Sequence, residues 1–301
     1  MVKSLYHRKH LKAWNARFRP GDIPIYLMFF IFALLTIYPF WYVLVGSFSH
    51  GTNYLTGGVY IWPRQWTIRN YLFILLDKRF YSSLGVTAAR TIIATIVSTV
   101  FTAMVGYAMS IRSTPFRRTM YIINIITLFF GGGLIPFFIL IVNLGLYDNF
   151  LVYIIPGIYS TFNMIIFANF FSRISKDLRE SALMDGANEF TIIFRIYFPI
   201  STPVFATIML WTAVGHWNAY YDTMLYSSSQ NMWTLQYYLL TMIKRLDAPP
   251  ELMGNIIFGE EITSTTVSDA AIVLSSVIIL AFYPLILKAF KRGQTMGSLK
   301  E

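Results

Sequence analysis

A group of polar and aromatic side chains lies within an otherwise apolar stretch, residues 202–226. Polar and ionisable groups in such a stretch usually face a cavity or a neighbouring helix and avoid lipid. Aromatic faces combined with Asn and Asp hydrogen bonds suit carbohydrate binding, whereas Trp and Tyr near the end of a span also form an interfacial belt. Both roles stay open for these side chains, which are Trp211, His216, Trp217, Asn218, Tyr220 and Asp222.

Arg90 is a basic residue within the second predicted span. Either its side chain snorkels to the interface, or it lines the same cavity, where a cation would suit an acidic glycan such as a uronate oligomer. His216 has no second ligand at metal spacing, so we expect a hydrogen-bonded helix residue there and predict no metal site. The chain also lacks a nucleophile–base constellation, which argues against an enzyme.

The composition predicts an integral membrane protein in one domain. Apolar residues make up 56% of the chain and charged residues 13%, compared with about 25% charged in soluble domains. The chain has no cysteine, which excludes disulfides and thiolate metal sites. Its net charge of +10 is concentrated in a basic arm at the start, which favours an anionic membrane surface over nucleic acid as partner.

Six apolar stretches predict an all-α protein with six transmembrane helices. Of the 24 Lys and Arg residues, 17 fall on one side of the membrane if the N-terminus is cytoplasmic. The positive-inside rule therefore places both termini in the cytoplasm. We expect a basic arm (1–23), a permease domain (24–291) and a cytoplasmic tail (292–301), with spans at 24–47, 84–110, 119–142, 150–171, 202–226 and 267–290.

The longest mixture of charged and apolar residues between two spans is the segment 173–200, which the same rule places in the cytoplasm. We expect a short helix with acidic residues near its start, a turn at Gly186, and a second helical piece over 187–198. Such a mixture suits a helix that binds in a groove of a soluble partner. Glu189 is interpreted as solvated, and the candidate contact residues are Glu180, Ser181, Ala182, Met184, Asp185, Gly186, Ala187 and Phe190.

Several motifs in this chain resemble those of a known family. The string Glu180-Ser181-Ala182, Gly186 and Ile196-x-x-Pro199 is similar to the coupling loop of ABC-importer permeases, with Ser where the second residue is usually Ala. The segments 131–147 and 290–301 resemble oligosaccharide permeases of the lipoprotein-associated, pectic or alginate branch. The chain is identified by this resemblance as a carbohydrate ABC-importer permease of the six-span, maltose-related kind.

The resemblance implies the type I importer fold and a set of partners in a bacterial cytoplasmic (inner) membrane. These are a second homologous permease, two ATPase subunits at the coupling loops, and an external binding protein that delivers an oligosaccharide. ATP and Mg would bind the ATPase, because this chain has no Gly-x-x-x-x-Gly-Lys-[Ser/Thr] loop. ATPase closure would move the coupling loop as a rigid body and alternate the access of the sugar path. The glycines at 131–133 are expected to give a kink and close helix packing.

The predicted outer loop, residues 227–266, contains an amphipathic segment at 232–246. In the family, the equivalent loop touches the binding protein. A lid packed on the span ends is an equally good interpretation. The candidate docking residues are Trp233, Tyr237, Tyr238, Lys244 and Arg245.

A secondary transporter driven by an ion gradient is the alternative function. Such proteins usually hold coupling carboxylates within the membrane and show internal repeats. Here the predicted spans hold only Asp222 and Asp269, and we detect no clear repeat. The dependence of transport on ATP or on an ion gradient distinguishes the two functions.

Overall fold

The structure, a computed structural model, describes residues 22–59, 61–246 and 262–297, and side chains as far as residue 281. Over these residues the secondary structure is helical, apart from one isolated bridge between Ser49 and Trp66. The predicted all-α class is confirmed to this extent. Most of the predicted arm, the segment 247–261 of the outer loop and the last four residues lie outside the described part.

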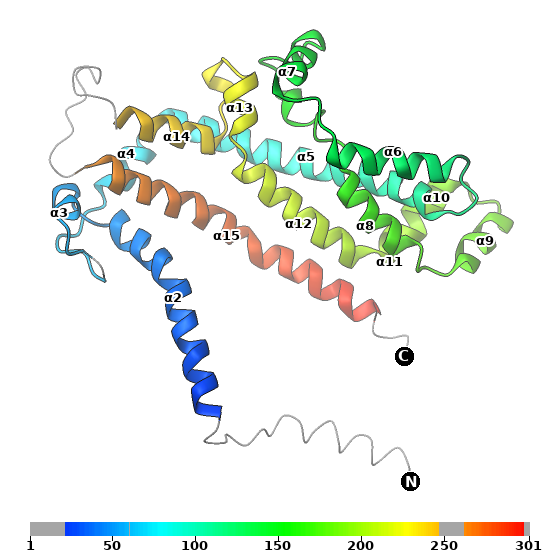
Figure 1. Cartoon of the computed structure of the whole chain (residues 1–301), viewed down its shortest axis with the longest axis horizontal. Coiled ribbons are helices and arrows are strands. Elements are labelled where there is room, and N and C mark those ends of the chain that lie inside the picture. The colour runs from blue at the N-terminus through cyan, green and yellow to red at the C-terminus, as the bar shows by residue number, and fades with distance from the viewer. Residues whose placement is uncertain (1–21, 60, 247–261, 298–301) are drawn as a thin grey trace.

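Helix α5 (Lys78–Ser110) is the central element. Its 33 residues give a length of about 50 Å. The Asp77 side chain accepts the N–H of Arg79 at 2.9 Å, which starts the helix before the predicted residue 84. Small Thr, Ser and Ala side chains on α5 permit close helix contact, and α8 (Thr161–Phe171) and α12 (Thr202–Asn218) pack against it (Figure 1).

Helices α2 (Ile23–Ser47) and α15 (Ser264–Gly297) meet near the end of α2. A Cβ on Gly46 would lie 2.0 Å from Asp269 Oδ2, so only glycine permits this close approach. Of the described residues of α2, only the last three are buried, and Figure 1 shows the helix diverging from the others toward its start. The first and sixth predicted spans are thus single helices, and α15 continues beyond the predicted end at 290.

The third predicted span is bent by 113° between α6 (Arg117–Phe129) and α7 (Leu134–Asn143). Gly133 adopts φ +85°, which a residue with a side chain rarely does. The expected kink is confirmed. The expected close packing is not seen, because no atom lies within 4 Å of a Cβ built on Gly131 or Gly132.

The fourth predicted span, 150–171, is not one continuous helix. The segment begins with the 3-10 turn η2 (Phe150–Tyr153) and becomes α-helical only at α8, where Ser160 accepts the N–H of Asn163. Pro156 and Gly157 interrupt it. The 11 residues of α8 reach about 16 Å, roughly half of the hydrocarbon thickness.

Three helices in the described ranges are long and apolar enough to cross a membrane, or five if each bent pair counts as one span. The six-span count therefore remains a prediction. The fifth predicted span is also interrupted, because α12 ends at Asn218 and α13 (Tyr221–Tyr226) follows a break.

Short elements gather at the two ends of the bundle (Figure 1). One end holds α3 (Gly51–Leu55), α4 (Arg69–Leu75) and α14 (Leu235–Leu246), and the short turn η4 (Gln230–Met232) precedes α14 in the chain. The other end holds α9 (Lys176–Met184), α10 (Glu189–Ile192), η3 (Ile193–Tyr197) and α11 (Phe198–Ile200). These elements belong to the segment 173–200, which we call the coupling loop after the family motif that it resembles, and we call this end the coupling-loop end.

Candidate functional site

The turn of the coupling loop is a helix cap built on Gly186. This residue follows α9 with φ +82°. Its N–H donates to the Leu183 carbonyl at 3.0 Å, and the N–H of Ala187 donates to the Ala182 carbonyl at 2.9 Å. The two bonds form a Schellman motif, whose flanking residues make an apolar contact. The predicted turn is confirmed. Ala182, Gly186 and Ala187, which stand out in the sequence motif, lie at the positions that the hydrogen bonds of this cap require.

The acidic residues are not where the sequence predicted them. Helix α9 begins at Lys176, after Ser175, whose hydroxyl accepts the N–H of Asp177 at 3.3 Å. The acid in its first turn is therefore Asp177, which the helix dipole favours there. Glu180 lies a turn further on, and Asp185 lies past the last helical residue. The expected acidic start of the helix is wrong for these two residues, because the cap lies one turn earlier.

The second arm of the coupling loop runs from α10 through η3 to α11 and then bends by 83° into α12. Asn188 Oδ1 accepts the N–H of Thr191 at 2.8 Å and starts the arm two residues after the predicted 187. The π-helical turn η3 precedes Pro199, whose missing N–H leaves a helical carbonyl unpaired. The arm is thus helical as predicted, with an irregular middle.

Large apolar side chains of the coupling loop face outward. Met184 is 88% exposed and Phe190 64% exposed, and Phe194 is exposed as well. Each of them is next in the sequence to a charged residue, which is Asp185, Glu189 and Arg195 respectively, so lipid tails would not suit this surface. An exposed apolar group with a charged rim is typical of a protein-binding site.

Glu189 connects the two arms of the coupling loop, so it is not merely a solvated carboxylate, although 46% of its side chain is exposed. Its carboxylate pairs with Arg179 of α9 and accepts a hydrogen bond from the Tyr107 hydroxyl of α5. Partial burial opposes its ionisation, but the bonds from Arg179 and Tyr107 outweigh burial and hold the pKa of Glu189 below its usual value. Tyr107 lies 82 residues away in the chain, so no local pattern could reveal this contact.

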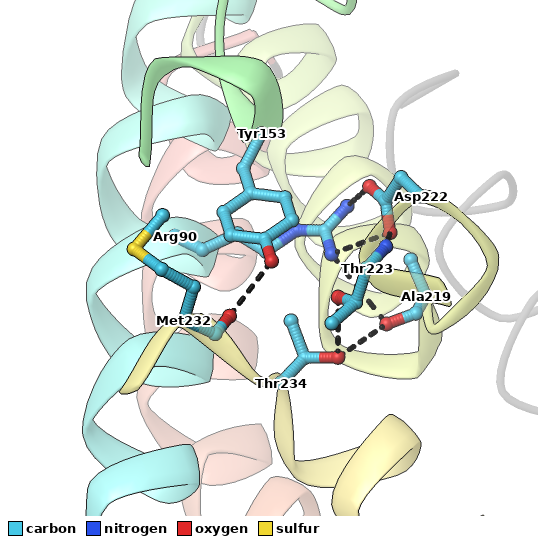
Figure 2. A network of polar contacts seen from close by, with 7 residues as sticks. All are labelled: Arg90, Tyr153, Ala219, Asp222, Thr223, Met232 and Thr234. Carbon is cyan, nitrogen blue, oxygen red and sulfur yellow. Dashed lines mark hydrogen bonds and ion pairs between the residues drawn. The ribbon is translucent and has the colours of Figure 1, made fainter. Parts of the chain in front are cut away.

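A second polar cluster surrounds Arg90 (Figure 2). The Arg90 side chain is 3% exposed and pairs with Asp222, with one bond of 3.0 Å. Its guanidinium lies over the ring of Tyr153, 4.7 Å from the centroid, and reaches the Ala219 carbonyl at 3.5 Å. The expectation that Arg90 snorkels or lines an open cavity is therefore wrong. The partner carboxylate lies next to the break after α12, so the ion pair fixes this break against α5.

Further hydrogen bonds extend the cluster to the segments that follow α12. The Thr223 and Thr234 hydroxyls bond each other at 2.9 Å, and Tyr153 donates to the Met232 carbonyl at 2.7 Å. One helical turn before Arg90 along α5, the Thr87 hydroxyl accepts the N–H of Leu235 at 2.7 Å. Together these contacts join α5, η2, α13, η4 and the start of α14.

The other predicted substrate-path residues divide into buried and exposed ones. Trp217 belongs to a hydrophobic core with Phe80, Leu235 and Val267, so its predicted place on the path is wrong for this chain. His216 is half-buried. The exposed residues are Trp211, Asn218 and Tyr220, and the Trp211 indole donates to Asn163 Oδ1 at 3.1 Å.

Comparison with known proteins assigns the chain. Residues 112–295 match the family described as the binding-protein-dependent transport system inner membrane component. The polygalacturonan/rhamnogalacturonan transport system permease protein YtcP of Bacillus subtilis is 33% identical over 93% of this chain and 98% of its own length. Protein LplC of the same organism is 34% identical over 88% of this chain and 90% of its own.

The chain belongs to this family. It is a permease subunit of an ABC importer, catalyses no reaction itself and leaves the ATPase to a separate chain. A similar solved structure, a bacterial ABC transporter involved in the import of the acidic polysaccharide alginate, has a TM-score of 0.81 and 32% identity, covering 91% of this chain and 99% of the solved one. The permease is accordingly an inner membrane component.

Helix α14 of the permease is amphipathic, as the segment 232–246 predicted. Its buried face includes Leu235 and Tyr238, and it packs on α5 and α15. Tyr238 is 2% exposed, so its prediction as a docking residue is wrong, because the hydrophobic core occupies that face. Trp233 and Tyr237 are half-buried with ring centroids 5.0 Å apart, while Lys244 and Arg245 are exposed.

Asp148 fastens the link after α7 to the turn that follows α13. Its carboxylate accepts the N–H groups of Ser228 at 3.1 Å and Ser229 at 2.9 Å, and its own N–H donates to the Tyr226 carbonyl at 2.8 Å. The bonds from Ser229 and then Ser228 hold the pKa of Asp148 below its usual range. Because the ionised form is favoured in the folded chain, the clamp persists above that range and is lost as the pH falls through the lowered pKa.

We expect Asp148→Asn to loosen this turn at neutral pH. A neutral amide accepts weaker hydrogen bonds than a carboxylate, so amide exchange at Ser228 and Ser229 should quicken by about tenfold. Hydrogen exchange with mass spectrometry on the peptide over 227–232 measures this. Asp177→Asn, at the opposite end of the bundle, serves as control, and equal exchange in both variants would contradict the clamp.

Proposed function

We propose that the chain is a permease subunit of an ATP-driven, binding-protein-dependent importer of an acidic oligosaccharide. Its coupling loop receives the ATPase, a second permease completes the transmembrane path, and an external binding protein delivers the sugar. Alternating access follows when ATPase closure moves the loop as a rigid body. Both termini and the coupling loop face the cytoplasm in this proposal.

The observation that carries the proposal is the exposed apolar surface of Met184 and Phe190 on a capped, polar-anchored loop. A rigid helix with apolar anchors and a charged rim fits a groove in a soluble protein. The Schellman cap at Gly186 and the Arg179–Glu189 pair fix the relative position of the two arms before any partner binds. Such preorganisation lowers the entropic cost of docking.

The substrate class rests on the relatives together with the side chains that stay exposed. A polygalacturonan and an alginate system both handle acidic glycans. In this chain Trp211, Asn218 and Tyr220 supply an aromatic face and amide hydrogen bonds on α12 and after it. Arg90 already pairs with Asp222, so we propose that the positive charge for a uronate comes from another subunit.

Met184→Glu tests the docking surface. A charge at the centre of an apolar contact should weaken ATPase retention by about tenfold or more, because the new carboxylate would be desolvated. The measurement is co-purification of the ATPase with the tagged chain from native membranes, quantified by mass spectrometry. Leu76→Glu is the matched control, since Leu76 is 79% exposed near α4 at the opposite end. Equal ATPase recovery in both variants would refute the docking surface.

The energy source distinguishes this proposal from a gradient-driven transporter. Asp222 is held by Arg90, which leaves Asp269 as the in-span carboxylate that a gradient mechanism would use. In vesicles of the complete system, uptake of a labelled oligogalacturonate should require ATP and survive an ionophore and Asp269→Asn. Uptake that continues without ATP and collapses in either of the other two conditions would replace the importer by the alternative.

A further inference from the structure

Two polar ties hold helix α5, one toward each end of the bundle. Arg90 binds Asp222 beside the break after α12, and Tyr107 binds Glu189 of the coupling loop. The two anchor residues are 17 positions apart, which is about 26 Å along one uninterrupted helix. An α-helix of this kind moves as a rigid element, so a displacement at one tie reaches the other.

The tie at Tyr107 crosses a gap. A cavity of about 400 Å³ separates the end of α5 and the following turn from the coupling loop. Its lining includes Ala108 and Thr114 on one side, and Glu189 and Phe190 on the other. The Tyr107 ring also packs on Tyr197 of the loop, with centroids 4.7 Å apart. The Tyr107 hydroxyl therefore supplies the polar part of the contact between α5 and the coupling loop, which is only partly packed because of the cavity.

The tie at Arg90 holds a place where the chain changes direction. Asp222 Oδ1 accepts the N–H of Thr223 at 2.9 Å as well as the bond from Arg90. The carboxylate thereby fixes both the first turn of α13 and its distance from α5. The aromatic face of Tyr153 covers the guanidinium, so the η2 turn follows the same anchor.

We propose that Tyr107 and Glu189 are positioning residues that connect the coupling loop to α5. In this proposal α5 carries a displacement of the coupling loop, through Arg90 and Asp222, to α13, η4 and the start of α14, which we call the outer segment. This inference rests on the proposed function, in which the loop receives the ATPase. It adds the specific path by which nucleotide binding changes the outer end. The ties are polar and directional, so the loop and the outer segment keep a fixed register on α5.

Tyr107→Phe tests the path because it removes the hydroxyl and keeps the ring. The chain has no cysteine, so a single Met224→Cys in α13 reports on the outer segment. The complete importer is labelled with a membrane-impermeant maleimide in the absence and the presence of ATP with vanadate. We expect the nucleotide-dependent change in labelling rate to fall by about fivefold in Tyr107→Phe, within the usual range for coupling residues, with ATPase retention unchanged.

Tyr159→Phe is the matched control. It removes a tyrosine hydroxyl that binds Asn124 of α6 and that has no part in the proposed path, so the nucleotide response should stay intact. An equal decrease in both variants would indicate general loosening and overturn the proposal. No decrease in Tyr107→Phe would also overturn it.

Arg90→Lys tests whether the two ties act in series. Lysine keeps the charge opposite Asp222 but loses the two-pronged contact and the stacking on Tyr153. If both contacts belong to one path, the nucleotide-dependent change in labelling rate of the double variant Arg90→Lys/Tyr107→Phe should be no smaller than that of the more impaired single variant. If the two contacts act independently, the fold-losses of the two single variants should multiply in the double variant. Multiplied losses would overturn the single path. If the labelling rate of Met224→Cys does not change with nucleotide in the importer that keeps both contacts, the proposed function is refuted, and this inference with it.

Discussion

Gly186→Pro is expected to produce a permease that enters the membrane and fails to retain its ATPase. Proline fixes φ near −65°, whereas Gly186 requires φ +82°. It also removes the N–H that bonds the Leu183 carbonyl. The two losses should cost the cap about 3 kcal/mol, which corresponds to a decrease of roughly a hundredfold in ATPase retention and in ATP-dependent uptake.

Gly145 provides a control with the same local structure at another site. It follows α7 with φ +68°, and the bonds of Gly145 to Val142 and of Leu146 to Ile141 form a second Schellman motif. No neighbouring atom lies within 4 Å of a Cβ on Gly145 or Gly186, so substitutions at both test backbone conformation alone. Gly145→Pro should keep the ATPase, and equal loss in the two variants would contradict the coupling role.

A graded series at Gly186 refines the test. Asn tolerates the left-handed region better than Ala, and β-branched residues tolerate it least. ATPase retention should therefore decrease in the order Gly, Asn, Ala, Val and Pro. An order that followed side-chain size without regard to φ would contradict the conformational explanation.

Arg90→Met is expected to give the largest loss of stability. It leaves the Asp222 carboxylate without its cation beside a packed helix junction, and removal of one partner of a buried pair costs about 3–5 kcal/mol. Asp222 retains some exposure, so we expect the lower value, about 3 kcal/mol, or roughly 10 °C in the midpoint of thermal unfolding. Intrinsic tryptophan fluorescence of the detergent-solubilised chain follows the transition.

The double variant Arg90→Met/Asp222→Leu separates the two parts of that loss. With both charges replaced by apolar groups, no unpaired carboxylate remains, and such replacements are often neutral or stabilising. The midpoint should return most of the way toward that of the unchanged chain. A double variant as unstable as Arg90→Met alone would show that Arg90 stabilises the fold by packing on Tyr153 and not by pairing.

Local features of this fold could be predicted from the sequence because neighbouring residues determine them. Gly186 after an apolar helix predicts a left-handed cap, and the three glycines at 131–133 predict a bend. The fourth span shows the limit of this reasoning. The stretch 150–171 is largely apolar and holds no Lys, Arg, Asp or Glu, yet the Asn149 and Ser160 caps and the intervening Pro156 leave only α8 α-helical.

The polar contacts could not be predicted, because their partners are distant in the chain. Arg90 and Asp222 are 132 residues apart, and each alone resembles a cavity-lining charge. Glu189 resembles any solvated loop carboxylate until Tyr107 of α5 is placed beside it. For Trp217 and Tyr238, aromatic residues near a span end suit both a ligand surface and a core. Only the packing of α12 and α14 on the bundle distinguishes the two.

The attachment of α2 to α15 also determines when the chain can finish folding. Gly46 and Asp269 are 223 positions apart in the sequence. At the usual rate of synthesis, about 5–20 residues per second, roughly 11–45 s pass between the appearance of the first residue and that of the second. During this interval the earliest helix has the bilayer but not its packing partner in α15. The bonds of Trp41 to Ile61 and of Ser47 to Tyr71 can form soon after α2 is synthesised, whereas the contact of α2 with α15 is completed only when α15 is inserted.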